Sequence, residues 1–135
     1  MRLHERIHGE LIKRLTASNV ERQLSLLRDL VEISLAIKDL RVDGAMVKWL
    51  HGHVTTGLVD GPGAYRDHNV FLRATGFEPP PHQDIKKLMG DFFPELHKRW
   101  NNERHPYLVA AYALWRLCWI HPFEDGNGRT ARAVA

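Results

Sequence analysis

The sequence predicts a mainly helical fold in a single domain. Apolar residues recur at steps of three and four in several segments, which is typical of helices that face a core. One stretch, residues 65–75, instead indicates extended or hairpin structure around Val70, Phe71 and Leu72. A length of 135 residues with 44% hydrophobic and 26% charged residues fits one globular domain and argues against a disordered chain.

The first forty residues contain the clearest helical pattern. Residues 20–37 carry an apolar stripe, which predicts a core-facing helix. Residues 3–15 show a weaker pattern that Gly9 interrupts, so we expect two N-terminal helices within residues 1–40. The stripe consists of Val20, Leu24, Leu27, Leu30, Val31, Ile33, Leu35 and Ile37.

Capping and turn residues delimit the next segments. Asp43 is placed to cap a short helix that includes Met46 and Leu50. Residues 57–63 hold three glycines and a proline, which predicts a loop. Three consecutive prolines, Pro79–Pro81, then predict a rigid extended segment.

Two further helices are expected before the end of the chain. The first runs from Asp84 to Trp100, and Pro94 is expected to kink or split it. The second begins at Pro106, a favoured first helical residue, and runs to Ile120. Because this helix is apolar on nearly all sides, we expect it to be central and buried, with Trp115 and Trp119 in the core.

Charge, cysteine content and hydropathy exclude several classes of protein. The net charge of +3 comes without a long Lys/Arg cluster, so nothing supports nucleic-acid binding. The single cysteine, Cys118, rules out an internal disulfide and fits a reducing compartment. His51 and His53 have no third ligand nearby, so we expect no metal between them. We see neither a signal peptide nor a membrane span, and we expect a cytoplasmic protein.

Residues 121–132, HPFEDGNGRTAR, follow the last predicted helix and concentrate the residues suited to chemistry. Pro122 disfavours helical geometry at His121, so the helix should end there and the imidazole should project from its end. Phe123 would anchor the loop to the core. Asp125 offers a carboxylate of the kind that Mg²⁺ binds together with phosphate oxygens and water.

The second half of this segment is suited to binding phosphate. Gly126 and Gly128 allow positive φ and close approach of backbone N–H groups to an anion, and a helix that starts near Gly128 would add its positive end. Arg129 and Arg132, three residues apart, would share one helix face and grip phosphate oxygens. Each feature alone has an ordinary structural explanation, such as a cap or a tight turn, but the combination is specific.

Residues 121–132 resemble the signature of the Fic family, H-x-F-x-[DE]-G-N-G-R-x-x-R, and the match is complete. The resemblance extends over roughly residues 40–135. It implies an all-α, Fic-like helical bundle with a small β-hairpin flap at residues 65–75. It also implies that residues 41–135 form the Fic core up to the motif, that the helices after the motif are missing, and that residues 1–40 are N-terminal helices. Upstream it rests on Trp49-Leu50-His51, Pro62–Arg66, Val70–Leu72, Pro79–Pro81 and His105–Ala111.

The resemblance implies transfer of AMP from ATP to a Ser, Thr or Tyr hydroxyl of a target protein. His121 would be the general base, and an imidazole with an ordinary pKa of about 6.5 suits that role. Asp125 would hold Mg²⁺. The amides around Gly126 and Gly128 would form the anion hole, Asn127 would fix the orientation of the phosphates, and Arg129 and Arg132 would stabilise the β- and γ-phosphates.

Two other functions stay open. One is transfer of a different phosphate group by a Doc-like protein kinase, although Gly128 stands where Doc proteins carry Lys. The other is a non-catalytic fragment that binds a nucleotide or a partner, which the truncated core favours.

The resemblance also implies protein partners. The target would dock on the flap hairpin by strand addition. We find no [ST]-x-x-x-E-[GN] inhibitory run; the nearest stretch, Thr56–Gly61, has Asp in place of Glu. Any restraint is therefore expected from a removed segment or from a partner in trans, and we expect no nucleic acid and no membrane as partners.

Overall fold

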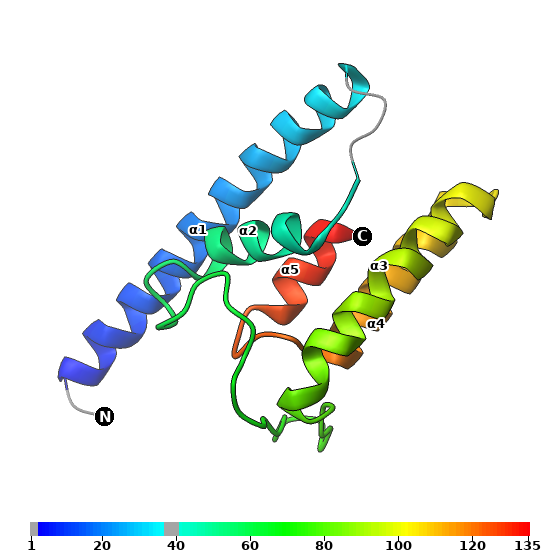
Figure 1. The fold of residues 1–135 in the computed structure, drawn as a ribbon. Coiled ribbons are helices and arrows are strands. Elements are labelled where there is room, and N and C mark those ends of the chain that lie inside the picture. Colours follow the sequence, from blue (N-terminus) through cyan, green and yellow to red (C-terminus); the bar gives the residue numbers. More distant parts are fainter. Residues whose placement is uncertain (1–2, 37–40) are drawn as a thin grey trace.

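A computed structural model describes residues 3–36 and 41–135, with side chains from residue 8 onward. The described residues form helices and irregular loops, without a strand of more than one residue pair. The elements are α1 (Leu3–Ala36), α2 (Gly44–Thr55), the short 3-10 helix η1 (His82–Asp84), α3 (Ile85–Asn102), α4 (Pro106–Ile120) and α5 (Asn127–Val134) (Figure 1). The prediction of an all-α chain is therefore confirmed. Ile37, the last residue of the predicted apolar stripe, lies outside the described residues.

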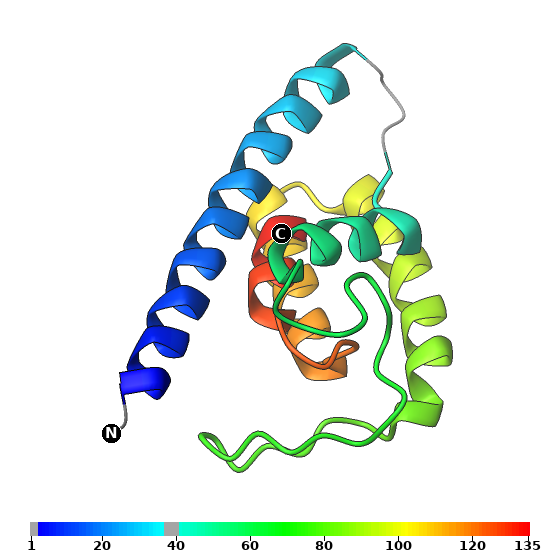
Figure 2. The same cartoon turned by 90° about the vertical axis from the view of Figure 1, so that its left-hand side faces the viewer.

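The short helix α5 occupies the middle of the molecule. It packs against α4, α2 and α1, and α3 packs on the other side of α4. The long helix α1 crosses α2 near its middle, and both of its ends project beyond the other helices (Figures 1 and 2). The core fills the space between α2, α3, α4 and α5. Its buried side chains are Val47, Ile85, Met89, Phe92, Leu96, Val109, Ala113, Leu117, Ile120, Phe123 and Ala131.

The start signals of three elements behave as predicted. The Asp43 carboxylate accepts a hydrogen bond from the N–H of Met46 at 2.8 Å and so caps α2. Pro106 is the first residue of α4, which ends at Ile120. Pro81 is extended, with φ −54° and ψ 144°, where the chain enters η1.

The apolar stripe predicted for residues 20–37 does not face a core. α1 is one continuous helix despite Gly9, and Leu24, Val31 and Leu35 are exposed. The buried side chains of α1 are instead polar, Asn19 and Gln23. The reason is geometric, because α1 contacts α2 and α5 around Asn19 and Gln23, and most of the stripe lies further along α1 (Figure 1).

The prediction of a central, buried α4 is correct for one face only. Val109, Ala113, Leu117 and Ile120 are buried. Trp115 is 58% exposed and Trp119 36% exposed, so both tryptophans lie outside the core. The guanidinium of Arg116 lies over both indole rings, which is a cation–π arrangement typical of a surface.

Pro94 does not split the helix that contains it. α3 runs without interruption from Ile85 to Asn102 with Pro94 inside it. Pro94 lacks the N–H that would donate to the carbonyl of Gly90. Both residues are exposed, so water can bind that carbonyl in place of the missing donor.

The predicted β-hairpin at residues 65–75 is absent. Within the described chain, pairing in this region is limited to one isolated antiparallel bridge between Leu72 and Phe77. The backbone of this segment is engaged elsewhere, since the N–H of Arg66 donates to Pro122 O and the carbonyl of His68 accepts from the Arg66 side chain. One bridged pair is too little to form a stable hairpin.

None of the helices described here is both long and apolar enough to cross a bilayer.

Candidate active site

His121 ends α4 in the left-handed conformation, with φ 51° and ψ 58°. Among the described residues it is the only non-glycine residue with positive φ. Its N–H still donates to Leu117 O, as in a helical turn, but the following proline prevents the helix from continuing. Backbone strain of this kind is concentrated at functional sites.

The hydrogen bonding of His121 leaves one ring nitrogen free. Nδ1 lies 3.3 Å from the carbonyl oxygen of Cys118. A carbonyl oxygen only accepts, so Nδ1 carries the hydrogen and Nε2 presents its lone pair. Burial is the main cause that lowers the pKa of His121, and the nearby Arg66 guanidinium lowers it further. The imidazole is therefore neutral near pH 7, as a proton acceptor must be.

The loop between His121 and α5 is closed from inside by Asn127. The side-chain oxygen of Asn127 accepts from the N–H of Phe123 at 2.9 Å, and its Nδ2 donates to the carbonyl of Phe123 at 2.8 Å. Phe123 is buried, as the sequence predicts for an apolar anchor. Because the polar atoms of Asn127 hold the shape of the loop, any effect of this residue on phosphate orientation acts through the backbone.

His51 supports the same loop and was not predicted as a site residue. Gly63 N–H donates to its Nδ1 at 2.9 Å, so the hydrogen sits on Nε2, which donates to Asp125 O at 2.9 Å. The buried ring stacks on Phe123 with 3.7 Å between centroids. Burial chiefly lowers the pKa of His51, which fits a neutral imidazole. No spacing in the sequence signals these contacts, because its partners lie 12 and 74 residues away.

Gly126 opens α5 without a side-chain cap. It has φ 74°, a conformation that favours glycine, and its carbonyl accepts the first helical bond, from Thr130 N–H. The N–H groups of Asn127, Gly128 and Arg129 donate to no acceptor among the described residues. Helix N-termini with N–H groups that lack an acceptor are suited to binding anions.

The two arginines of the motif differ in their contacts. Arg129 donates to Val54 O at 3.1 Å and forms an ion pair with Asp125 at 3.3 Å. Arg132 is exposed and makes no ion pair with a described carboxylate. Its side chain lies over Gly128, with Nη1 3.4 Å from the position that a Cβ on Gly128 would take. Both guanidiniums therefore lie on the first turns of α5, with Arg132 free to bind an anion.

The motif loop offers two carboxylates, Glu124 and Asp125, and Asp125 is the one in contact with Gly126 and Arg129. Its Oδ1 accepts from Gly126 N–H, and its Oδ2 faces Arg129. In the described part of the chain no three His, Cys, Asp or Glu side chains form a metal-binding group. One exposed carboxylate beside the N-terminus of α5 nevertheless has the chemistry that Mg²⁺ needs, because this ion can take its other ligands from phosphate oxygens and water.

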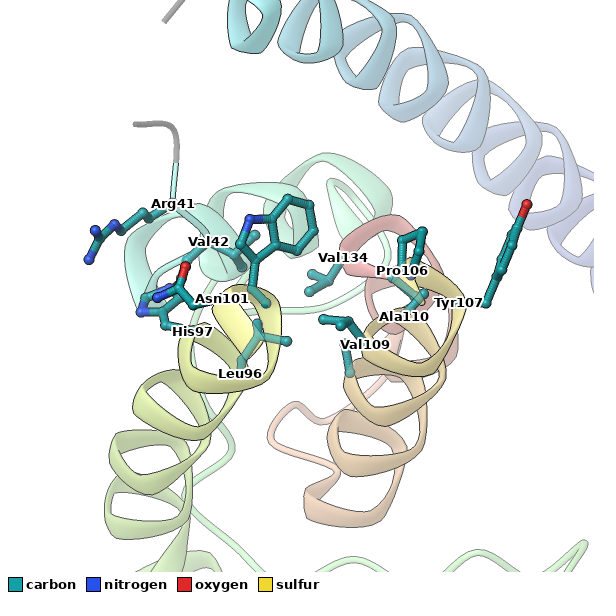
Figure 3. A pocket seen from close by; sticks show the side chains of 13 residues that line it. Arg41, Val42, Leu96, His97, Asn101, Pro106, Tyr107, Val109, Ala110 and Val134 are labelled. Carbon is teal, nitrogen blue, oxygen red and sulfur yellow. The ribbon is translucent and has the colours of Figure 1, made fainter. Parts of the chain in front are cut away.

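A cavity of about 450 Å³ lies away from these residues. It is lined by side chains such as Leu96, Trp100, Val109 and Val134, from the ends of α3, α4 and α5 (Figure 3). His121 follows the last residue of α4, whereas the cavity lies against its first turns. The cavity is therefore separate from the candidate active site.

Comparison with known proteins shows to which family the chain belongs. The Fic/DOC family profile matches residues 41–135. A protein adenylyltransferase Fic of Drosophila persimilis is 35% identical over 103 residues, which are 76% of this chain and 19% of that protein. One of Nematostella vectensis is 41% identical over 72 residues, 53% of this chain and 16% of that protein. The chain thus spans about a fifth of the length of these curated relatives.

Solved structures agree. A Fic family protein of Desulfovibrio desulfuricans has a TM-score of 0.59 and 32% identity, covering 67% of this chain and 28% of that one. BepC of Bartonella tribocorum, solved with bound AMPPNP, has a TM-score of 0.66 at 17% identity, covering 93% of this chain and 65% of that one, and shows a shared fold. The chain belongs to the Fic/DOC family.

Proposed function

We propose that the protein transfers AMP from Mg·ATP to a hydroxyl side chain of a target protein. The proposal rests on two features at the two ends of the motif loop. One is a neutral His121 whose Nε2 has no partner among the described residues, and the other is the N-terminus of α5, which has no side-chain cap. The naming of the relatives as protein adenylyltransferases supports the same reaction.

In this reaction the target hydroxyl attacks the α-phosphorus of ATP. The new bond joins the hydroxyl oxygen to phosphorus, the bond from the α-phosphorus to the bridging oxygen breaks, and pyrophosphate leaves. The hydroxyl proton would pass to Nε2 of His121; the contact of Nδ1 with Cys118 O, which leaves the lone pair on Nε2, supports this role. The free N–H groups of Asn127, Gly128 and Arg129 stabilise the negative charge on the phosphate oxygens.

The remaining charge is neutralised by cations. We propose that Arg129 and Arg132 bind the β- and γ-phosphates; this is supported by the exposed Arg132 guanidinium, which forms no ion pair with a carboxylate of the described residues. Asp125 would hold Mg²⁺, which, when bound, offsets phosphate charge. Removing the Arg132 guanidinium is expected to weaken use of ATP about 10- to 150-fold and use of ADP less, since a charge-assisted hydrogen bond contributes about 1.5–3 kcal/mol.

The target would lie along residues 65–75 and the proline segment. A cavity of about 480 Å³ lies between Pro79–Pro81, Asn69 and Trp119, two residues before His121. This supports access of a target segment to the imidazole from that side. We also propose that restraint comes from a segment or partner in trans, because residues 56–61 form turns and bends after α2 rather than an inhibitory helix.

The test is incubation of the protein with target-containing lysate and ATP labelled at either the α- or the γ-phosphate. AMP transfer predicts α-label on protein, lost in His121→Ala while Mg·ATP binding persists. Label from the γ position alone would instead establish a Doc-like kinase. Binding of ATP without any transfer would establish a non-catalytic nucleotide-binding module.

A further inference from the structure

Arg66 is a buried cation that binds backbone carbonyls only. The residue is 5% exposed. Its Nε donates to His121 O at 2.8 Å, its Nη1 to His68 O at 2.9 Å and its Nη2 to Pro80 O. No carboxylate of the described chain lies within ion-pair distance of it.

Burying Arg66 in this way is expected to lower the stability of the fold, which suggests that the residue has a specific role. A buried charge loses its hydration, and neutral carbonyls replace that hydration less well than a carboxylate does. Burial accordingly lowers the pKa of Arg66 from its ordinary value. The planar guanidinium, with five donors in a fixed fork, is the side chain that can reach three carbonyls in different directions.

The carbonyl bound by Nε belongs to the strained residue His121. The backbone N–H of Arg66 also donates to the next carbonyl, Pro122 O, at 2.9 Å. Arg66 therefore holds two consecutive carbonyls on the C-terminal side of a left-handed φ. Relaxation of His121 to an ordinary φ would swing the first carbonyl away and break the bond from Nε.

We infer that Arg66 is a positioning residue for the candidate base: it holds His121 in the left-handed conformation and so fixes the direction of the imidazole. The inference rests on the proposed role of His121 as the base. Because the hydrogen bonds of Arg66 go to backbone carbonyls of this chain, Arg66 would act through His121 and not as a catalytic residue. It also joins His121 to His68 and Pro80, so the base and the target-facing segment are held by the same side chain.

The first test is the substitution Arg66→Lys, with Arg104→Lys as a matched control, because Arg104 is exposed and lies between α3 and α4, outside the candidate active site. Lysine keeps the charge but offers a single nitrogen that cannot reach three carbonyls. At temperatures where the variant is fully folded, we expect kcat for AMP transfer to fall about 10- to 100-fold, since small misplacements of a catalytic group have effects of that size. The Kd for Mg·ATP should change less than about twofold, because no nucleotide-binding group contacts Arg66.

A second measurement does not require activity. In nuclear magnetic resonance, the ³J coupling between the amide hydrogen and Hα of His121 reports φ of that residue, and this coupling should shift in Arg66→Lys but not in Arg104→Lys. If Arg66→Lys does not fold, Arg66→Ala with added methylguanidinium replaces it, and restored coupling and kcat are expected. Unchanged coupling together with unchanged kcat would overturn the inference. Equal losses of kcat and ATP affinity would also overturn it. Absence of AMP transfer in the native protein would instead refute the proposed function, while the coupling would still test Arg66.

Discussion

Substitution of Gly126 by alanine tests whether the motif loop requires glycine at this position, because the surrounding atoms leave no space for a Cβ. Gly126 has φ 74°, and a Cβ added there would lie 2.6 Å from Cγ2 of Thr55. Thr55 is fully buried and its hydroxyl donates to His51 O at 2.7 Å, so its methyl group cannot simply rotate away. The substitution therefore combines a strained backbone with overpacking.

The expected loss of stability is the sum of these two effects. A left-handed conformation costs an L-residue about 1–2 kcal/mol, and overpacking of a core costs about 1–3 kcal/mol. Gly126→Ala should thus lower the free energy of unfolding by about 2–5 kcal/mol, a large share of the stability of a small domain.

Urea denaturation followed by far-ultraviolet circular dichroism measures this loss, and Gly128→Ala is the matched control. A Cβ at Gly128 meets only the flexible end of Arg132 at 3.4 Å, inside a helix, so the change should be neutral or stabilising by up to about 1 kcal/mol. A loss for Gly126→Ala no larger than for Gly128→Ala would refute the reasoning.

The two causes can be separated with Thr55→Ser. Serine lacks the clashing methyl but keeps the hydroxyl that donates to His51 O. In a double-mutant cycle with Gly126→Ala, we expect about 1–3 kcal/mol of the loss to be recovered. No recovery would mean that backbone strain alone accounts for the effect and that the packing argument is wrong.

Four further outcomes are expected. Asn127→Ala should lower stability in urea by about 1–3 kcal/mol for each Phe123 backbone group left buried and unpaired, and a loss under 1 kcal/mol would contradict the closed loop. Because burial lowers the pKa of His121, its proton-accepting form persists below pH 6.5, so the acid limb of kcat/KM should have its midpoint below 6.5; a midpoint above that would count against a buried base. The unfolded chain binds that proton first, so stability should fall as pH drops below about 6.5. Gly90→Ala, in α3 with open space around its Cβ position, should raise the midpoint of urea unfolding by the equivalent of about 0.5–1 kcal/mol, and a decrease would argue against a regular helix there.

The motif could be predicted in detail because its structure is set by local rules. Pro122 ends the helix at His121, Gly126 adopts the left-handed turn, and α5 begins one residue later. Each of these features depends on residues within a few positions in the chain. Local signals also placed neighbouring elements: the Asp43 cap marked the start of α2, Pro106 marked the start of α4, and the predicted helix from Asp84 to Trp100 lies within two residues of α3 at each end.

The parts that could not be predicted depend on contacts between distant segments. His51 and Arg66 contact backbone atoms that lie up to 74 residues away, and a carbonyl acceptor leaves no trace in the sequence. For the same reason an apolar stripe identifies a helix but not what covers it, as the exposed Val31 and Trp115 demonstrate. The predicted hairpin is absent, and at its start the N–H of Arg66 donates to Pro122 O in the motif loop, a partner that no local pattern reveals.

The buried polar residues of α1 give the clearest case of structure that periodicity misses. Gln23 donates to Leu50 O, and Asn19 donates to Thr56 O, so α1 is held by carbonyls near the C-terminal end of α2. Helix C-termini have carbonyls without helical partners, and donors from other segments satisfy them.

Arg129 donates to a carbonyl in the same group, Val54 O, which also accepts a longer bond from Asn19. One end of α2 therefore fixes both the crossing of α1 and one motif arginine. A search for apolar stripes ignores amide side chains. In α1, however, the amides of Asn19 and Gln23 determine which face of the helix packs against α2. The orientation of the arginine that would meet the phosphates thus depends on the same helix end that anchors the N-terminal helix.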